Sequence, residues 1–238
     1  MLILALDSTA LAASVALCRD ETPLAAFTLQ NGNTHSQTLL PMVSSALKIA
    51  GYTISDVGLF ACSKGPGSFT GVRIGAATVK GLAFGSGKPV IGVSTLEALA
   101  ENLMPARGLF CPVMNARRGQ VYNALFRSDG QTLVRLCPDR AVSLPELEKE
   151  LADLGEPYFL CGDGSALAAG ALRLHAPENT PELLLPQNAV SVARCALRAY
   201  RAGIRTTEEE LAPAYLRLPQ AERERLEKEK AKKEGTKP

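Results

Sequence analysis

The chain has few of the residues from which catalytic and nucleic-acid-binding sites are usually built. None of its 238 residues is tryptophan, five are tyrosine and seven are phenylalanine, which leaves few aromatic platforms for stacking bases. The two histidines, His35 and His175, do not form the His-x3-His pair of a metal-binding helix. The six cysteines form no Cys-x-x-Cys motif and mostly lie in apolar runs, which is typical of reduced thiols in a cytosolic protein. The sequence therefore predicts neither a metal site nor a bound cofactor.

The slight excess of basic residues belongs to the C-terminal tail. Basic residues total 26 and acidic residues 24; residues 219–238 hold seven and five of these, which leaves 19 of each sign elsewhere. The body thus lacks the basic footprint of a nucleic-acid-binding domain. No apolar run is long enough to span a membrane, and Asp7 interrupts the apolar start, so we expect a cytoplasmic protein without a signal peptide. We expect the tail, residues 219–238, to be mobile or marginally helical, because it can bury almost nothing.

The most distinctive stretch is glycine-rich and spans residues 64–85, directly after an apolar run at 57–63 that predicts a buried strand. Glycine and proline at its start predict a turn, and Ser68 or Thr70 is placed to cap the following helix. A strand, a glycine-rich turn and a helix N-terminus can bind an anion, but the Gly-Lys-Ser/Thr of a P-loop is missing. The helix has three interpretations: it packs tightly on its own sheet, it docks on a partner's helix, or it follows a phosphate loop. The signature turn consists of Gly65, Pro66, Gly67, Ser68, Phe69, Thr70 and Gly71.

A second helix is predicted at residues 36–50, and both helices are expected on one face of the first sheet. Each has more apolar or small positions than one contact with a sheet can cover. We therefore predict that they meet two helices of a partner in a four-helix bundle, or a second copy of the chain. The predicted partner surface consists of Leu40, Met42, Val43, Leu47, Gly71, Ile74, Gly75, Thr78 and Leu82.

The predicted elements repeat along the chain. Each half contains three strands, a helix, a strand and a helix, with a possible strand at 183–185 and a last helix at 190–202 in the second half. This order predicts an α/β protein of two tandem actin-like ATPase (RNase H-like) lobes, each βββαβα. The expected boundaries are 1–105 for the N-terminal lobe, 106–218 for the C-terminal lobe and 219–238 for the tail.

In actin-like folds, turns from both lobes hold a nucleotide in the cleft between them. The corresponding turns here are Asp7-Ser8-Thr9 and the one containing Gly162 and Gly164. They are weak nucleotide candidates, because ordinary turn chemistry is the favoured explanation for both. Arg117 and Arg118 lie in another turn, where they either contact an anion or RNA or are merely solvated. No Gly-x-Ser-x-Gly elbow and no distinct pair of acids is present, so no catalytic residue is assigned.

Several motifs together resemble the TsaB (YeaZ) family. They are the stretch 65–75, which is the most specific, and the segments 4–9, 35–41, 93–99, 116–122 and 213–217. The resemblance covers residues 1 to about 217. The chain departs from the family pattern at Asn115, where an aspartate is usual, and in the tail after Pro219.

The resemblance implies a non-catalytic subunit of bacterial tRNA threonylcarbamoyladenosine (t6A) biosynthesis. Its expected partner is a TsaD-type transferase, which modifies adenosine 37 of tRNAs reading ANN codons. A TsaE-type ATPase is expected in the larger assembly, and contact with tRNA only through the complex. The alternatives are an ATPase or phosphotransferase of the actin-like fold, which would bind ATP tightly, and, least favoured, a metallopeptidase.

Overall fold

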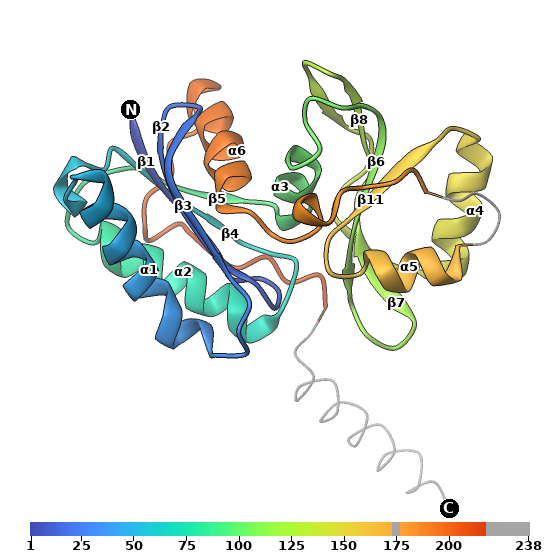
Figure 1. The fold of residues 1–238 in the computed structure, drawn as a ribbon, viewed down its shortest axis with the longest axis horizontal. Coiled ribbons are helices and arrows are strands. Elements are labelled where there is room, and N and C mark those ends of the chain that lie inside the picture. Colours follow the sequence, from blue (N-terminus) through green and yellow to red (C-terminus); the bar gives the residue numbers. More distant parts are fainter. Residues whose placement is uncertain (173–176, 218–238) are drawn as a thin grey trace, which may run out of the picture.

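The computed structural model describes residues 1–172 and 177–217, so the predicted tail and His175 lie outside the described residues. Two mixed sheets stand side by side, with helices on both faces of each (Figure 1). The first sheet has strand order β3-β2-β1-β4-β5, with β1 parallel to β4 and antiparallel to β2. Its strands are β1 (Leu2–Asp7), β2 (Ala13–Arg19), β3 (Thr22–Leu29), β4 (Leu59–Ser63) and β5 (Val90–Val93).

The first sheet is covered on both faces, which explains its continuous apolar strands. Leu4 and Leu6 of β1 face the core under α1 (His35–Ala50) and α2 (Phe69–Ala83), whereas Ile3 and Ala5 face α6 (Ala189–Arg201). The prediction that α1 and α2 lie side by side on one face of the first sheet is confirmed. Helix α1 ends where expected, at Gly51, whose φ of 75° is the left-handed conformation that glycine adopts readily.

The second sheet is built around β6 (Arg107–Asn115), which pairs with β11 (Tyr158–Cys161) on one edge and with a broken strand on the other. Two strands, β7 (Gln120–Asn123) and β8 (Phe126–Asp129), follow one another along β6 in a single register. Pro112 of β6 lies opposite the break and has no N–H to donate to the ladder. The outer edge is likewise divided, into β9 (Leu133–Arg135) and β10 (Arg140–Ser143).

Helices α4 (Leu144–Leu154) and α5 (Ser165–Ala171) cover one face of the second sheet (Figure 1). Helix α4 begins with a capping box, because the Ser143 hydroxyl accepts from the Glu146 N–H and the Glu146 carboxylate accepts from the Ser143 N–H. The possible strand at 183–185 is wrong: this segment forms a 3-10 turn, η2 (Glu182–Leu184). Another 3-10 turn, η1 (Ile54–Asp56), precedes β4.

The last helix of each half packs on the sheet of the other half. Helix α3 (Thr95–Glu101) follows β5, but Leu96 and Leu99 pack on Phe110 and Phe126 of the second sheet. Helix α6 is the last helix of the second half, yet its apolar face covers β1, β2 and β4 of the first sheet. The expected division into 1–105, 106–218 and 219–238 stays a prediction; the two sheets follow it, whereas α3 and α6 cross it.

Helices α3 and α6 also contact each other between the two sheets, which joins the halves. The guanidinium of Arg198 on α6 pairs with Glu101 of α3 at 3.0 Å and with Glu97 at 3.4 Å. Within the described ranges, none of the helices has the length and apolar character needed to cross a membrane.

Candidate functional site

The turn after β1 is closed by its own hydrogen bonds. One carboxylate oxygen of Asp7 accepts from the Thr9 N–H at 2.8 Å and from the Thr9 hydroxyl at 2.7 Å, and the other accepts from the Ser63 hydroxyl at 2.5 Å. Burial raises the pKa of Asp7, and the hydrogen bonds from Ser63 and Thr9 oppose that rise. Both oxygens of the predicted nucleotide-turn carboxylate are therefore occupied from within the chain.

The signature turn packs directly on this first turn. The Ser68 N–H donates to the Thr9 carbonyl at 2.7 Å, and the Ser8 hydroxyl donates to the Gly71 carbonyl at 2.8 Å. A Cβ on Gly71 would lie 1.9 Å from the Ser8 carbonyl oxygen, so only glycine permits this approach. Ser68 is the cap of α2, since its hydroxyl accepts from the Gly71 N–H. The predicted helix cap is thus confirmed at Ser68.

The turn after β11 repeats this geometry in the second half. The Gly164 N–H donates to the Val113 carbonyl at 3.1 Å, and a Cβ on Gly162 would lie 2.2 Å from the same oxygen. Between the two glycines lies Asp163, whose pKa is raised by desolvation and by the negative charge of Asp7. The structure therefore brings the two predicted turns, one from each sheet, within electrostatic range of each other.

The segment after α6 connects the signature turn to the second sheet. The Ala214 N–H donates to the Lys64 carbonyl at 2.6 Å, and the Tyr215 ring packs on Phe69 with a centroid distance of 4.8 Å. Arg73 lies 3.7 Å from the centre of the Phe69 ring, and its Nε donates to the Tyr215 hydroxyl at 2.8 Å. At the end of the segment, Arg217 donates to the Ala116 carbonyl at 2.6 Å and to the side chain of Gln120.

The hairpin between β6 and β7 carries Arg117 and Arg118, both exposed and both with a positive φ. Asn115 supports the turn, because its Oδ1 accepts from the Arg117 N–H at 2.8 Å. An aspartate could accept the same bond. It would, however, place a further carboxylate beside Asp163, which accepts from the Asn115 backbone N–H. The asparagine at this position thus keeps the turn and reduces the negative charge around it.

These contacts gather motifs from both ends of the chain but provide little reactive chemistry. Among the described residues no three histidine, cysteine, aspartate or glutamate side chains are placed to share a metal ion. His35 lies beside the first turn, where its Nε2 hydrogen-bonds the Ala10 carbonyl at 2.7 Å. Most of the polar groups at this junction hold segments of the protein together.

The predicted partner surface is only partly exposed. Met42, Val43 and Leu47 of α1 are buried in the chain's own core, as are Gly71 and Gly75 of α2. A Cβ on Gly75 would lie 2.6 Å from the Ser8 hydroxyl oxygen. The placement of Gly71 and Gly75 on the partner surface is therefore wrong, because these glycines face inward and let α2 approach the turn after β1. The exposed or half-exposed members of the predicted set are Leu40, Ile74, Thr78 and Leu82.

The outer face of α2 instead carries Ala77 and Gly81, which the sequence analysis did not select. Both are exposed, and a Cβ on Gly81 would meet no atom within 4 Å. They lie one helical turn apart, next to the half-exposed Ile74, Thr78 and Leu82. The sequence signal was present in this spacing, but helical periodicity alone does not say which of two small-residue stripes faces inward.

The sequence comparisons place these features in a family. A family model described as "TsaD: tRNA N6-adenosine threonylcarbamoyltransferase" matches residues 30–224. The "tRNA threonylcarbamoyladenosine biosynthesis protein TsaB" of Bacillus subtilis is 35% identical over 167 residues, which cover 70% of this chain and 73% of that protein. Its Escherichia coli counterpart is 38% identical, with 69% and 72% covered. The chain belongs to the TsaB family. The resemblance stated from the motifs is confirmed.

Solved structures agree with this assignment. The structure titled "YeaZ from Pseudomonas aeruginosa" superposes with a TM-score of 0.76 at 27% identity and covers 90% of this chain and 99% of that chain. The ethanolamine utilization protein EutJ from Carboxydothermus hydrogenoformans has a TM-score of 0.50 at 12% identity over 82% of this chain and 90% of its own, and so shows a shared fold alone. The expected fold class, α/β of the actin-like ATPase (RNase H-like) type, is confirmed.

Proposed function

We propose that this chain is a non-catalytic subunit of t6A biosynthesis that binds a TsaD-type transferase. The names of the TsaB relatives support the pathway, and the matching family model, described as a transferase, supports the partner. The transferase would modify adenosine 37 of tRNAs reading ANN codons, in the cytoplasm. A TsaE-type ATPase would join the complex, and the chain would meet tRNA through its partner.

The outer face of α1 and α2 carries this proposal. Gly81 costs α2 about 1 kcal/mol relative to alanine, and internal packing does not require the glycine, because a Cβ there would meet no atom within 4 Å. A glycine and an alanine one turn apart let another helix approach closely, and the flanking Ile74 and Leu82 supply apolar contact. On α1, Leu40 is 53% exposed. The docking face proposed here comprises Leu40, Ile74, Ala77, Thr78, Gly81 and Leu82.

The turns at the junction support the non-catalytic part of the proposal. An ATPase of this fold needs turn amides and a carboxylate that are free to hold phosphate and metal. Here the Asp7 carboxylate accepts three hydrogen bonds from the chain, including one from the Thr9 N–H. Rearranging these groups around a nucleotide would break buried hydrogen bonds, each of which costs about 1–3 kcal/mol when a partner is left unsatisfied.

The docking face is tested by placing arginine at Gly81 and, as a matched control, at Gly170. Both glycines are exposed on helices and have open space where a side chain would begin. We expect Gly81→Arg to weaken binding to the organism's TsaD-type protein by at least about 100-fold, and Gly170→Arg to leave it unchanged. Light scattering and calorimetric titration measure the complex, and circular dichroism verifies the fold. Native affinity of a folded Gly81→Arg chain would place the interface elsewhere.

A separate assay tests the lack of catalysis. The pure chain is supplied with threonylcarbamoyl-adenylate and unmodified tRNA, with and without the TsaD-type protein. We expect t6A only when the transferase is present, and no tight binding of ATP and magnesium by the chain alone. Turnover by the isolated chain would contradict the proposal. If the free chain forms a homodimer through the same face, Gly81→Arg should also make it monomeric.

A further inference from the structure

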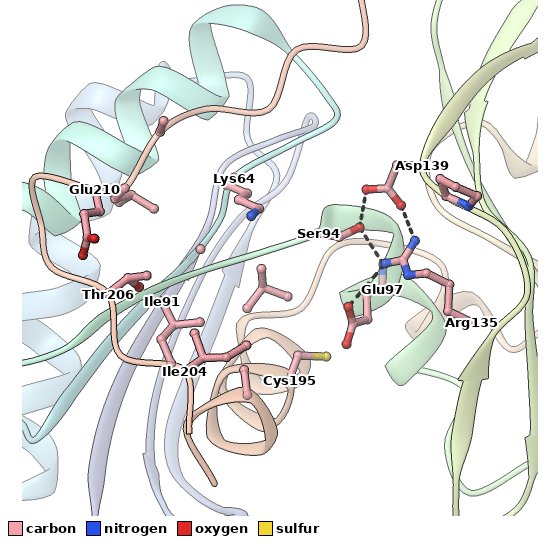
Figure 2. Close-up of a pocket in the computed structure, with 16 residues that line it drawn as sticks. Lys64, Ile91, Ser94, Glu97, Arg135, Asp139, Cys195, Ile204, Thr206 and Glu210 are labelled. Carbon is pink, nitrogen blue, oxygen red and sulfur yellow. Dashed lines mark hydrogen bonds and ion pairs between the residues drawn. The ribbon is translucent and has the colours of Figure 1, made fainter. Parts of the chain in front are cut away.

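A cavity of about 620 Å³ lies away from the proposed docking face, between the two halves of the molecule (Figure 2). On the side of the first sheet it is lined by β5, by α6 and by the segment at residues 204–212. On the other side it is lined by Arg135, Pro138 and Asp139 of the second half. Its volume lies within the range of about 300–1,000 Å³ that is usual for small-molecule sites.

Among the described residues, the charged side chains that line this cavity have a hydrogen bond or an ion pair, with one exception. Asp139 accepts from the Ser94 hydroxyl at 2.6 Å and from Arg135 at 2.5 Å, and Glu97 pairs with Arg135 at 3.3 Å. Glu210 accepts from the Thr207 N–H at 2.8 Å. Within residues 1–172 and 177–217, the ammonium group of Lys64 has neither a hydrogen bond nor an ion pair.

The position of Lys64 is built into the fold. Its backbone N–H donates to the Val93 carbonyl at 2.8 Å, and its stem crosses Gly92, where a Cβ would lie 2.9 Å from the Lys64 Cδ. Figure 2 shows the nitrogen of Lys64 directed into the space that separates it from Ser94. The absence of a side chain at Gly92 therefore gives the lysine its path into the cavity.

The remaining wall is mostly apolar. Ile91, Val93, Ile204 and Leu211 contribute aliphatic side chains, and Cys195 contributes a buried thiol. Burial raises the pKa of Cys195, so that the sulfur is uncharged at neutral pH and adds apolar surface. One side of the cavity can thus cover a hydrocarbon body while Lys64 holds an acidic head.

We propose that this cavity binds a small organic monoanion, with its carboxylate on Lys64 and its apolar body on β5, α6 and the segment 204–212. A single unpaired cation matches a single negative charge. Glu97, Asp139 and Glu210 line the same cavity and would repel a phosphate dianion about twice as strongly as a carboxylate monoanion.

Hexanoate is the probe for this site, with hexylamine, hexanol and hexyl phosphate as comparisons. We expect hexanoate to bind with a Kd of about 1 mM, which is reasonable for a ligand with so few atoms. The other three probes should bind at least 10-fold more weakly. At 10 mM hexanoate, mass action should raise Tm by about 3–6 °C. Backbone amide shifts in NMR spectra should concentrate at residues 91–94 and 204–212.

Variants distinguish binding of hexanoate at this site from nonspecific binding. Lys64→Met should weaken hexanoate binding at least 10-fold, whereas Lys88→Met, at an exposed lysine that does not line the cavity, should leave it unchanged. If Lys64→Met does not fold, the second variant is Ile204→Glu, since Ile204 is half exposed on the wall. The added carboxylate should abolish binding, whereas Ile204→Leu should retain it. The proposal would be overturned if hexylamine bound as tightly as hexanoate, or if a folded Lys64→Met or Ile204→Glu protein kept full affinity for hexanoate. Amide shifts concentrated outside residues 91–94 and 204–212 would also overturn it.

Discussion

Helices α2 and α5 occupy corresponding places in the two halves, and they differ in length and in the surface that they expose. Both follow the strand beside the central one, and both begin with a glycine pressed onto the end of that central strand or the turn after it. Helix α2 has 15 residues, whereas α5 has seven. Only α2 is long enough to cover its own sheet with one face and to present a second face of several turns.

The comparison separates two uses of small residues. At Gly71 and Gly164 the missing side chain serves the internal packing that both halves share. At Gly81 internal packing does not require the missing side chain, because a Cβ there would meet no atom within 4 Å, so we assign this glycine to the proposed docking face. The predictions below test this distinction, in order of decreasing effect.

The strongest test replaces the first glycine of α2. Gly71→Ala should cost more than about 3 kcal/mol or prevent folding, because its Cβ would lie 1.9 Å from the Ser8 carbonyl oxygen. Gly170→Ala on α5, which meets open space, should instead stabilise the protein by about 0.5–1 kcal/mol. Urea denaturation measures both. A Gly71→Ala protein of native stability would show that α2 does not need the close approach.

The corresponding change in the second half should be milder. A Cβ on Gly164 would lie 3.0 Å from the Met114 carbonyl carbon, a distance that small shifts can relieve. We expect Gly164→Ala to cost about 1–3 kcal/mol, which is less than Gly71→Ala. The same denaturation experiment decides the order, and a larger loss at Gly164 would reverse the comparison.

The pH dependence of stability should reveal the buried carboxyl of the first turn. Burial raises the pKa of Asp7 in the folded state, so unfolding releases a proton between the ordinary pKa and the raised one, and stability falls as pH rises through that window. Asp7→Asn removes this slope, and each unit of difference between the folded and unfolded pKa is worth about 1.4 kcal/mol. The wild type should therefore lose stability relative to Asp7→Asn as pH rises above the ordinary carboxyl pKa.

Asp56 provides a control of opposite sign for that experiment. Hydrogen bonds from the backbone and side chain of Thr53 lower the pKa of Asp56, which is exposed. Its contribution to stability is present above the ordinary pKa and is lost as pH falls through the lowered one. Relative to Asp56→Asn, the wild type should therefore gain stability as pH rises. Slopes of the same sign for the two pairs would contradict the roles assigned to both carboxyls.

The smallest effect is expected at the contact between α2 and the C-terminal segment. Tyr215→Phe removes the hydroxyl that accepts from Arg73 but keeps the ring on Phe69. Because the site is partly exposed, the loss should be about 0.5–1 kcal/mol. Tyr215→Ala, which also removes the ring contact, should cost more. Thermal unfolding of both variants checks the order, and equal losses would mean that the ring adds nothing.

The sequence by itself determined the elements and the family. Apolar runs, helix periodicity and caps such as Ser68 are local signals, so most of the strands and helices and their order could be predicted. The division of the strand beside β6 into β7 and β8, and the 3-10 turn Glu182–Leu184, could not. The signature turn carried the family resemblance because its glycines and serine are needed at particular places, as the contacts with Ser8 and Thr9 show.

Only the tertiary structure decided which surfaces meet. The exchange of α3 and α6 between the sheets cannot be inferred from periodicity, because an apolar stripe fits either sheet equally well. The same degeneracy hid the inward direction of Gly71 and Gly75 and the outward direction of Gly81, which lie on one helix with similar spacing. Long-range backbone contacts, such as that of α2 with the turn after β1, choose between these faces, and they exist only once the chain has folded.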